Sequence, residues 1–285
     1  MATVNTSIVS NVSDTARWVA VYRARESARA DALFDDPYAD QLSGQRGRDI
    51  AVLMPRQAGN GWPIVARTKL IDDLVQASIA EGADCVLNLA AGFDTRPYRL
   101  ELPPSLRWAE ADLPALIEEK ERLLADARPR CQLSRIKVDL ADPIARAAML
   151  QDVLSSSRKT VVVTEGLLLY LDDVQVRSLS ADLFKHAGTA SWILDLASPA
   201  LLRMLHKSMG QHFANTPMKF APPNGIAFFE ALGWSADEVT SILHAAARFR
   251  RLPFFLRIVA LFPDPNPRSL KNAPWSGVVK LQRRE

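Results

Sequence analysis

The sequence is poor in the residues that form disulfides and metal sites. Only two cysteines, Cys85 and Cys131, occur among 285 residues. Both lie in apolar, strand-like runs, so we expect buried free thiols in a reducing compartment. The four histidines are scattered, and no spacing among them matches a zinc site. We therefore expect neither a disulfide framework nor a bound metal.

Long apolar runs and blocks of like charge are also missing. The longest apolar run, Leu252–Phe262, has only eleven residues and contains a proline and an arginine, whereas a membrane-spanning helix needs about 20. We expect this run in the core, with a subunit contact, and hence a homo-oligomer, as the alternative. Residues 1–11 lack the apolar centre of a signal peptide. With a net charge of +3 and no like-charge block, we expect a cytoplasmic protein without a nucleic-acid or membrane partner.

Glycine is scarce where a phosphate-binding loop would need it. The turn Ala90–Thr95, which follows the first expected strand, contains one glycine and an aspartate, Asp94. A dinucleotide site needs glycines that let main-chain N–H groups meet a pyrophosphate, and no G-x-x-x-x-G-K-[ST] motif occurs. The charge of Asp94 would also oppose a pyrophosphate. NAD and ATP are therefore disfavoured, although a NAD-dependent reductase stays as an alternative.

What the sequence does contain is an alternation of strand-like and helix-like segments that begins at residue 85. The expected strands are Cys85–Ala90, Arg107–Asp112, Leu133–Val138, Thr160–Glu165, Ser191–Leu196, Trp234–Ser241 and Ser276–Gln282. The helical segments between the first five are 94–100, 113–127, 143–155 and 172–187. This order predicts an α/β protein with a doubly wound, mostly parallel sheet of about seven strands. The last two strands flank an expected helix at 242–261 and would form an antiparallel edge hairpin.

The chain before the first strand is expected to cap this sheet. Helical patterns cover 15–29 and 64–81, whereas the glycines and prolines of 44–63 predict irregular structure. We therefore divide the chain into an N-terminal arm and helical cap, 1–63, and a Rossmann-like domain, 64–285. A lid insertion is expected at about 198–223, after the fifth strand.

Four successive expected strands end in, or next to, a carboxylate. These acids are Asp94, Asp112, Asp139 and Glu165. Because ligands bind outside the carboxyl ends of such strands, the four should line one site. Asp112 can accept hydrogen bonds from ribose hydroxyls, and Asp139 with Leu140 suits an adenine. The sequence therefore favours an adenosine derivative.

An adenosine ligand that carries positive charge instead of phosphate fits this acidic edge best. S-adenosylmethionine has an ammonium, a sulfonium and one carboxylate. Asp94 or Glu165 could face the ammonium. Arg67 and Arg23 are candidates for the carboxylate, because both precede the sheet on helices expected to cap it.

Seven short motifs, taken together, resemble a known family. They are SDTA at 13–16, DPYA at 36–39, RTKLID at 67–72, NLAAGFDTR at 88–96, EADLP at 110–114, DL at 139–140 and EGLLLYL at 165–171. Their order and spacing resemble the leucine carboxyl methyltransferase family, and most closely its bacterial branch of S-adenosylmethionine-dependent O-methyltransferases. The resemblance extends from about residue 13 to residue 245 and implies a class I methyltransferase fold.

The resemblance also implies roles for individual residues. The implied cofactor-binding residues are Arg23, Arg67, Ala90, Gly92, Asp94, Asp112, Leu113, Asp139, Leu140 and Glu165. Tyr170 would border the acceptor pocket, and the cap helix would close over it through Trp18 and Tyr22. No residue is implied as a catalytic base. One position departs from the family, which usually has Gly-x-Gly where this chain has Ala90, and the added methyl group would narrow the turn.

The methyl acceptor is expected to be a small molecule. A carboxylate acceptor is ionised at neutral pH and needs no base, whereas a hydroxyl needs one, and no histidine or lysine is a convincing base here. The methionines and aromatic residues of 198–223 favour an apolar or aromatic acid. Two alternatives remain. The first is a protein C-terminal carboxylate as acceptor, and the second is a non-catalytic cofactor-binding protein, which Ala90 favours.

Overall fold

The protein is built around one mixed sheet of seven strands. The computed structural model describes residues 8–9, 11–54, 61–186, 190–213 and 215–283. The strands are β1 (Cys85–Leu89), β2 (Arg107–Asp112), β3 (Gln132–Lys137), β4 (Thr160–Thr164), β5 (Ala190–Ala197), β6 (Trp234–Ser241) and β7 (Ser276–Arg283). Their order across the sheet is β3-β2-β1-β4-β5-β7-β6. This confirms the predicted α/β fold class.

The direction of the strands defines the point at which a ligand can enter. Strands β1 to β5 are parallel, whereas β7 runs antiparallel between β5 and β6. The predicted antiparallel pair is therefore confirmed. The chain proceeds outward from β1 to β3 and then returns to β4, beside β1. The carboxyl ends of β1 and β4 thus form the switch point where such sheets bind ligands.

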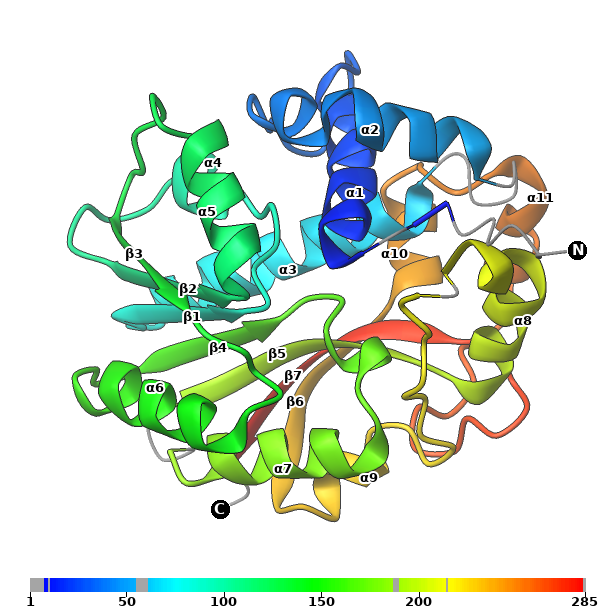
Figure 1. Ribbon diagram of the computed structural model, residues 1–285. Helices are drawn as coiled ribbons and strands as arrows, with labels where there is room; N and C mark the ends of the chain where they lie inside the picture. The colour runs from blue at the N-terminus through cyan, green and yellow to red at the C-terminus, as the bar shows by residue number, and fades with distance from the viewer. Residues whose placement is uncertain (1–7, 10, 55–60, 187–189, 214, 284–285) are drawn as a thin grey trace, which may run out of the picture.

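Helices cover both faces of the sheet (Figure 1). One face carries α3 (Trp62–Ala80), α4 (Arg96–Arg99), α5 (Pro114–Leu123) and α10 (Ile242–Arg248). The other carries α6 (Pro143–Ser155), α7 (Asp173–Phe184) and α9 (Ala227–Glu230). Successive strand residues supply both cores because they point to opposite faces: Val86 packs with α3, and Leu87 lies in the core beneath α6 and α7.

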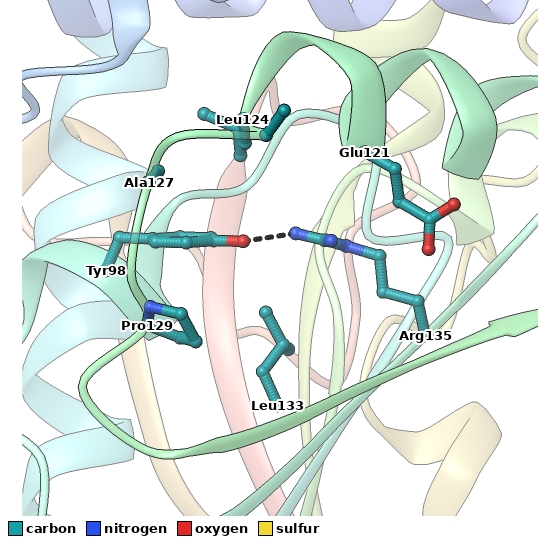
Figure 2. A pocket seen from close by; sticks show the side chains of 8 residues that line it. Tyr98, Glu121, Leu124, Ala127, Pro129, Leu133 and Arg135 are labelled. Carbon is teal, nitrogen blue, oxygen red and sulfur yellow. Dashed lines mark hydrogen bonds between the residues drawn. The ribbon is translucent and has the colours of Figure 1, made fainter.

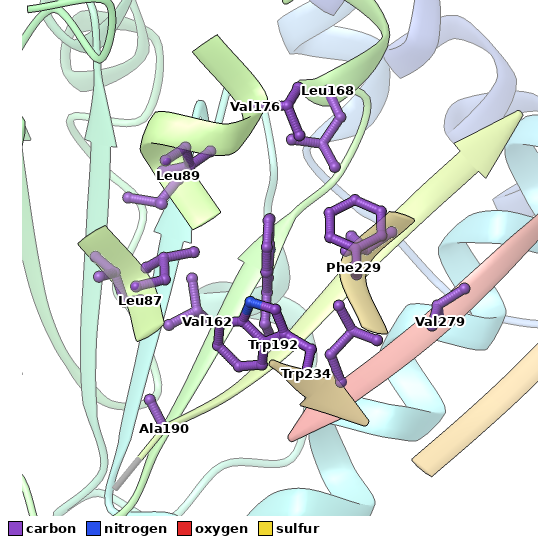
Figure 3. Packing of buried hydrophobic residues seen from close by; sticks show 14 of the residues in the cluster. Leu87, Leu89, Val162, Leu168, Val176, Ala190, Trp192, Phe229, Trp234 and Val279 are labelled. Atoms are coloured by element: carbon purple, nitrogen blue, oxygen red, sulfur yellow. The ribbon is translucent and has the colours of Figure 1, made fainter. Parts of the chain in front are cut away.

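Large aromatic side chains fill the core beneath α6 and α7, as Figure 3 shows. Trp192 and Trp234 meet edge to face with ring centroids 5.5 Å apart, and Phe229 packs on Trp192 at 5.4 Å. Both indoles also find hydrogen-bond partners, since Trp192 donates to Thr164 and Trp234 to Ser180. These contacts fix β4, β5 and β6 relative to one another, and so hold the strand ends that form the site.

The N-terminal cap consists of α1 (Val12–Ser27) and α2 (Ala39–Leu53). The prediction of irregular structure at 44–63 was wrong for residues 44–53, because α2 continues to Leu53, and residues 55–60 lie outside the described residues. The glycines of α2 serve close packing instead. A Cβ on Gly47 would lie 2.8 Å from the carbonyl oxygen of Arg17 in α1, so only glycine lets the two helices approach this closely. Gly44, with φ of 56°, accommodates a kink.

The predicted long helix at 242–261 was also wrong. Helix α10 ends at Arg248, Arg250 takes a left-handed φ of 58°, and the chain turns outward at Pro253. Two short helices follow, α11 (Phe254–Arg257) and η3 (Val259–Leu261). Most of their apolar side chains lie on the surface, and only Leu256 and Ala260 pack against the core. Among the described residues, no helix combines the length and the apolar character that crossing a membrane requires.

The expected lid region contains α8 (Pro199–Met209) and η2 (Gly210–Phe213). It packs on the cap and on η1 (Leu168–Tyr170) through what we call the cap–lid cluster. That cluster is formed by Val9, Ile50, Met54, Leu202, Met209 and Met218, with Ile8, Trp18, Leu169, Tyr170, Leu205 and Ala221 packed against it. The main chain joins the same elements, since the N–H groups of Lys219 and Phe220 both donate to the carbonyl of Leu169.

Candidate functional site

The turn after β1 is held in place by the carboxylate at the end of β2. Ala90 and Gly92 both have left-handed backbones, with φ of 54° and 48°. Asp112 accepts one hydrogen bond from the N–H of Gly92, at 2.7 Å, and one from the N–H of Leu113, at 2.8 Å. Burial raises the pKa of Asp112, and the two N–H donors oppose that rise. Each oxygen keeps a lone pair for a further donor, as a ribose hydroxyl would require.

Helix α1 covers this turn from above. A Cβ on Gly92 would lie 3.4 Å from the Cβ of Ala16 in α1. Arg23, also in α1, donates to the carbonyl of Phe93 and to Asp36, the latter at 2.8 Å. The guanidinium of Arg23 therefore connects the cap to the turn. Its predicted contact with a cofactor carboxylate stays a prediction.

A cluster of alternating charges lies at the carboxyl ends of β1, β4 and β5. This switch-point charge cluster consists of Arg67, Arg96, Arg99, Asp72, Asp94, Glu165 and Asp195. Arg67 reaches it from α3 and bridges two strands. Its Nε lies 3.0 Å from Glu165, after β4, and its Nη1 lies 3.0 Å from Asp195, in β5.

Arg96 is the hub of the cluster and is almost completely buried. Its Nη1 lies 2.8 Å from Asp94 and 2.8 Å from Glu165, and its Nε lies 2.6 Å from Asp72. Arg99 completes the group by binding Asp72 at 2.7 Å. Buried charges persist only when they are paired in this way. Arg96 thus brings together Asp94 and Glu165, which the sequence placed at the ends of two different strands.

The arginines keep two acids of the cluster, Asp94 and Glu165, ionised. Burial alone would raise the pKa of Asp94, but Arg96 and its neighbours hold that pKa well below its usual range. Burial would likewise raise the pKa of Glu165, and Arg96 with Arg67 lowers it instead. Both groups are therefore carboxylates at neutral pH. Three arginines then face four carboxylates, which leaves a net charge of −1 for the cluster.

The open side of the cluster is formed by Arg67, Glu165 and Asp195, whose side chains are 15–17% exposed. Because Arg67 uses Nε and Nη1 for these two carboxylates, the donors of Nη2 can still bind a ligand. Gly166, with φ of 69°, leaves room beside the guanidinium, where a Cβ would stand 3.5 Å from Arg67 Nη1. Its N–H donates to Asp195 at 2.6 Å.

Sequence reasoning assigned no role to Arg96 or Asp195. The sequence nevertheless contained an indication of a role for each of them. Arg96 lies two positions after Asp94 in the turn, and Asp195 is a charge inside an otherwise apolar strand. A partly buried charge in a strand of this sheet needs a partner, and here that partner is Arg67.

The predicted adenine residues lie on the same edge but outside the charge cluster. Asp139 is exposed and accepts from the N–H of Ala141 at 2.8 Å, while Leu140 is partly buried. The N–H of Val138 donates to the carbonyl of Asp112 at 2.9 Å, so this segment adjoins the end of β2. Leu113 is 38% exposed beside it. The proposed adenosine contacts therefore share one continuous edge.

The predicted acceptor residues divide into two groups. Tyr170 and Trp18 belong to the cap–lid cluster, and burial raises the pKa of Tyr170 to about 12, so its phenol is neutral. Tyr22 is only 1% exposed, and Trp18 packs on it edge to face at 5.6 Å. A Cβ on Gly61 would lie only 2.1 Å from Cδ1 of Tyr22, so the ring packs directly against this glycine. Tyr22 therefore packs the cap, and of the three only Tyr170 and Trp18 lie where the cap meets the lid.

A recess of about 310 Å³ lies elsewhere, between α5 and the start of β3 (Figure 2). Tyr98, Glu121 and Arg135 line it, and Arg135 donates to the phenol oxygen of Tyr98. Arg135 also binds the buried Glu110 at 3.0 Å. None of the predicted cofactor or acceptor residues borders this recess, so it is separate from the switch-point site.

Known proteins with this sequence pattern are methyltransferases by name. A protein of Frankia alni and one of Streptomyces coelicolor, each named "putative S-adenosyl-L-methionine-dependent methyltransferase", are 32% identical to the chain over 85% and 80% of its length, and over 89% and 84% of their own. The crystal structure of a "putative methyltransferase" from Thermobifida fusca has the same fold. Its TM-score is 0.59 at 15% identity, with 95% of this chain and 94% of that chain covered. The family model for leucine carboxyl methyltransferase matches residues 16–184, more than half of the chain. The chain belongs to the leucine carboxyl methyltransferase family.

Proposed function

We propose that this chain transfers a methyl group from S-adenosylmethionine to the carboxylate or hydroxyl of a small, apolar or aromatic molecule. The expected enzyme class and cofactor are confirmed by the family and by the names of its members. The acceptor and the O-methylation are our proposal. The observation that supports them is the position of Tyr170 in η1. It packs against the apolar cap–lid cluster, and it lies close enough to Arg67 and Asp195 of the charge cluster for their charges to act on its phenol.

The residues at the switch point suit this cofactor. Its ammonium and sulfonium, set against one carboxylate, give a net charge of +1, which complements the net −1 of the charge cluster. Nη2 of Arg67 would hold the cofactor carboxylate, and Glu165 or Asp94 would face the ammonium. Asp112 would take the ribose hydroxyls, with Asp139 and Leu140 at the adenine. Ala90 and Gly92 would lie against the methionine part.

When bound, the cofactor supplies a methyl group that is already activated by its positive sulfur. The protein then has to position the acceptor in line with that methyl group and keep water out. The cap–lid cluster provides an apolar wall for this purpose through Trp18 and three methionines. Methionine adapts to irregular shapes, which suits a binding surface for an apolar molecule.

Tyr170 would orient the acceptor rather than remove its proton. Because burial raises its pKa to about 12, the phenol stays protonated at neutral pH and can donate a hydrogen bond to an acceptor oxygen. An ionised carboxylate needs only such a donor, whereas a hydroxyl would need a base. A carboxylate acceptor therefore agrees best with the side chains found here.

Calorimetric titration with S-adenosylmethionine tests the cofactor site. Asp112→Asn keeps an acceptor for the N–H of Gly92 but loses the charge, and we expect it to weaken binding about 10- to 100-fold, the range for a charged hydrogen bond. The matched control is Asp237→Asn, an exposed aspartate on the edge strand β6, which should bind like the wild type. Unchanged affinity in Asp112→Asn would refute the assignment.

Incubation of cell extract with the enzyme and a labelled methyl donor tests the acceptor. We expect the label in a small apolar molecule and its release as methanol by mild alkali, because a methyl ester hydrolyses where a methyl ether does not. Label that resists alkali would assign a hydroxyl acceptor, and label that sediments with protein would support a protein carboxylate. Cofactor binding without any labelled product would favour the non-catalytic alternative.

A further inference from the structure

An apolar surface surrounds the two short helices between α10 and β7. We call it the α11 patch; its side chains are exposed by 49% to 82% and belong to Phe254, Phe255, Ile258, Val259, Leu261 and Phe262. An aromatic side chain buries about 150–250 Å² when it is fully covered. With the lower part of that range for all six residues, these fractions amount to about 600–700 Å² of exposed surface. Monomeric proteins rarely expose contiguous apolar patches larger than about 300–600 Å².

The segment that carries the patch is held in a fixed position by contacts with the rest of the fold. Leu256 and Ala260 in the same segment point inward and pack on the core that α3 and α10 share. His244 in α10 holds the far end, since its Nε2 lies 3.1 Å from the carbonyl oxygen of Phe262 and its Nδ1 lies 2.8 Å from Asp264. The inward residues thus fix the segment, and the outward ones form a preformed apolar face.

We propose that the α11 patch is the contact surface of a homodimer with two-fold symmetry. A stable interface of standard size buries about 800 Å² on each partner, which the area of the patch approaches. A two-fold dimer places the same patch on both sides, so each apolar face would be covered by its equal. The apolar centre of such interfaces resembles a protein core.

The charges at the edge of the patch give the dimer a salt dependence that can be measured. Arg248, Arg250 and Arg257 are exposed around it, and among the described residues none of them forms a salt bridge. Two patches brought face to face would therefore bring like charges together. Salt screens such repulsion, so we expect the dimer to tighten as salt is added. Adsorption of the same arginines to an anionic membrane surface would weaken instead.

Sedimentation equilibrium of the full chain tests the proposal. We expect twice the chain mass of 31.5 kDa, and a dissociation constant that falls between about 50 mM and about 500 mM salt as the Debye length shrinks. Leu261→Glu should weaken the dimer at least about 100-fold, because each residue occurs twice in a two-fold interface and a buried anchor is worth tenfold or more. The matched control is Ile144→Glu on α6, since Ile144 is 81% exposed and Leu261 is 82% exposed.

Circular dichroism should show both variants folded. Two results would overturn the proposal: a monomer at concentrations up to about 100 µM, where standard interfaces associate, or a dimer that Leu261→Glu leaves intact. A further experiment measures whether the protein sediments together with vesicles of phosphatidylglycerol and phosphatidylcholine. A monomer that binds these vesicles through Leu261, and is released by salt, would replace the dimer by a membrane surface as the partner.

Discussion

The side-chain methyl group of Ala90 should affect both the stability of the protein and its affinity for the cofactor. It follows β1 with φ of 54°, a left-handed conformation that suits glycine. A residue with a Cβ in this region is strained by about 1–2 kcal/mol. Ala90→Gly removes this strain but gives the unfolded chain more freedom, which costs about 0.4–1 kcal/mol. We therefore expect a net stabilisation of about 0.5–1 kcal/mol.

Denaturation by urea measures this difference directly. For a chain of this size the same change corresponds to a rise in melting temperature of about 1–4 °C. Arg250→Gly is a matched control, because Arg250 also has a left-handed backbone, at φ of 58°, and it lies beyond α10, away from the predicted cofactor residues. Both substitutions should stabilise. Ala91→Gly, at a residue without positive φ, should destabilise by about 0.4–1 kcal/mol.

Calorimetry with S-adenosylmethionine separates the two effects. Ala90→Gly should also bind the cofactor about three- to tenfold more tightly, a gain of about 0.7–1.4 kcal/mol, because the methyl group narrows the turn beside the methionine part. Arg250→Gly should leave the affinity unchanged. If Ala90→Gly is no more stable than the wild type while Arg250→Gly is, the turn is not strained. Equal affinities would show that the Cβ does not crowd the ligand.

Three further substitutions test the charge cluster and the acceptor site. Asp195→Asn removes a partner of Arg67 and should raise the KM for the cofactor about tenfold with little change in kcat; an equal loss in kcat would contradict a role confined to binding. Arginine partners hold the pKa of Glu165 below its ordinary value of 4.5, so its ionisation should contribute stability above about pH 4.5 that is lost as the pH falls below it. Urea unfolding at pH 7 and pH 4 should therefore show a smaller acid loss in Glu165→Gln than in the wild type, and equal losses would refute the sign. Tyr170→Phe keeps the ring but not the donor, so the KM for the acceptor should rise while cofactor binding is unchanged, and an unchanged KM would exclude the hydrogen bond.

The fold could be predicted from the sequence because its strands leave an unambiguous pattern. Strands β1 and β4 are buried throughout and consist mostly of apolar residues, and each is followed by a turn with glycine. The structure of the N-terminal cap was predicted less accurately. Gly47 is typical of a loop, but its function depends on packing against the main chain of Arg17 in the preceding helix α1. Local patterns do not record such contacts.

The segment from Phe254 to Phe262 shows a second limit. Apolar residues with helical spacing predict a buried face, and Leu256 with Ala260 does supply one. The same spacing cannot reveal that Arg250 and Pro253 redirect the chain and leave the remaining apolar residues outside. Whether such an apolar run is buried or exposed depends on whether the sheet still has an uncovered apolar surface against which it can pack.

The charge of the site was predicted for a reason that the structure modifies. Because four acids stand at or next to four successive strand ends, the sequence predicted an acidic edge. The structure places Asp94 and Glu165 against the same nitrogen of Arg96, Nη1, and Asp195 beside Arg67. Isolated carboxylates at this depth would take up protons, because burial raises their pKa. The arginines keep Asp94 and Glu165 ionised. An edge with four unpaired acids would attract any cation, whereas this one holds a small net charge in fixed positions. Such an arrangement suits a ligand that carries both signs, as an amino-acid group attached to a sulfonium does.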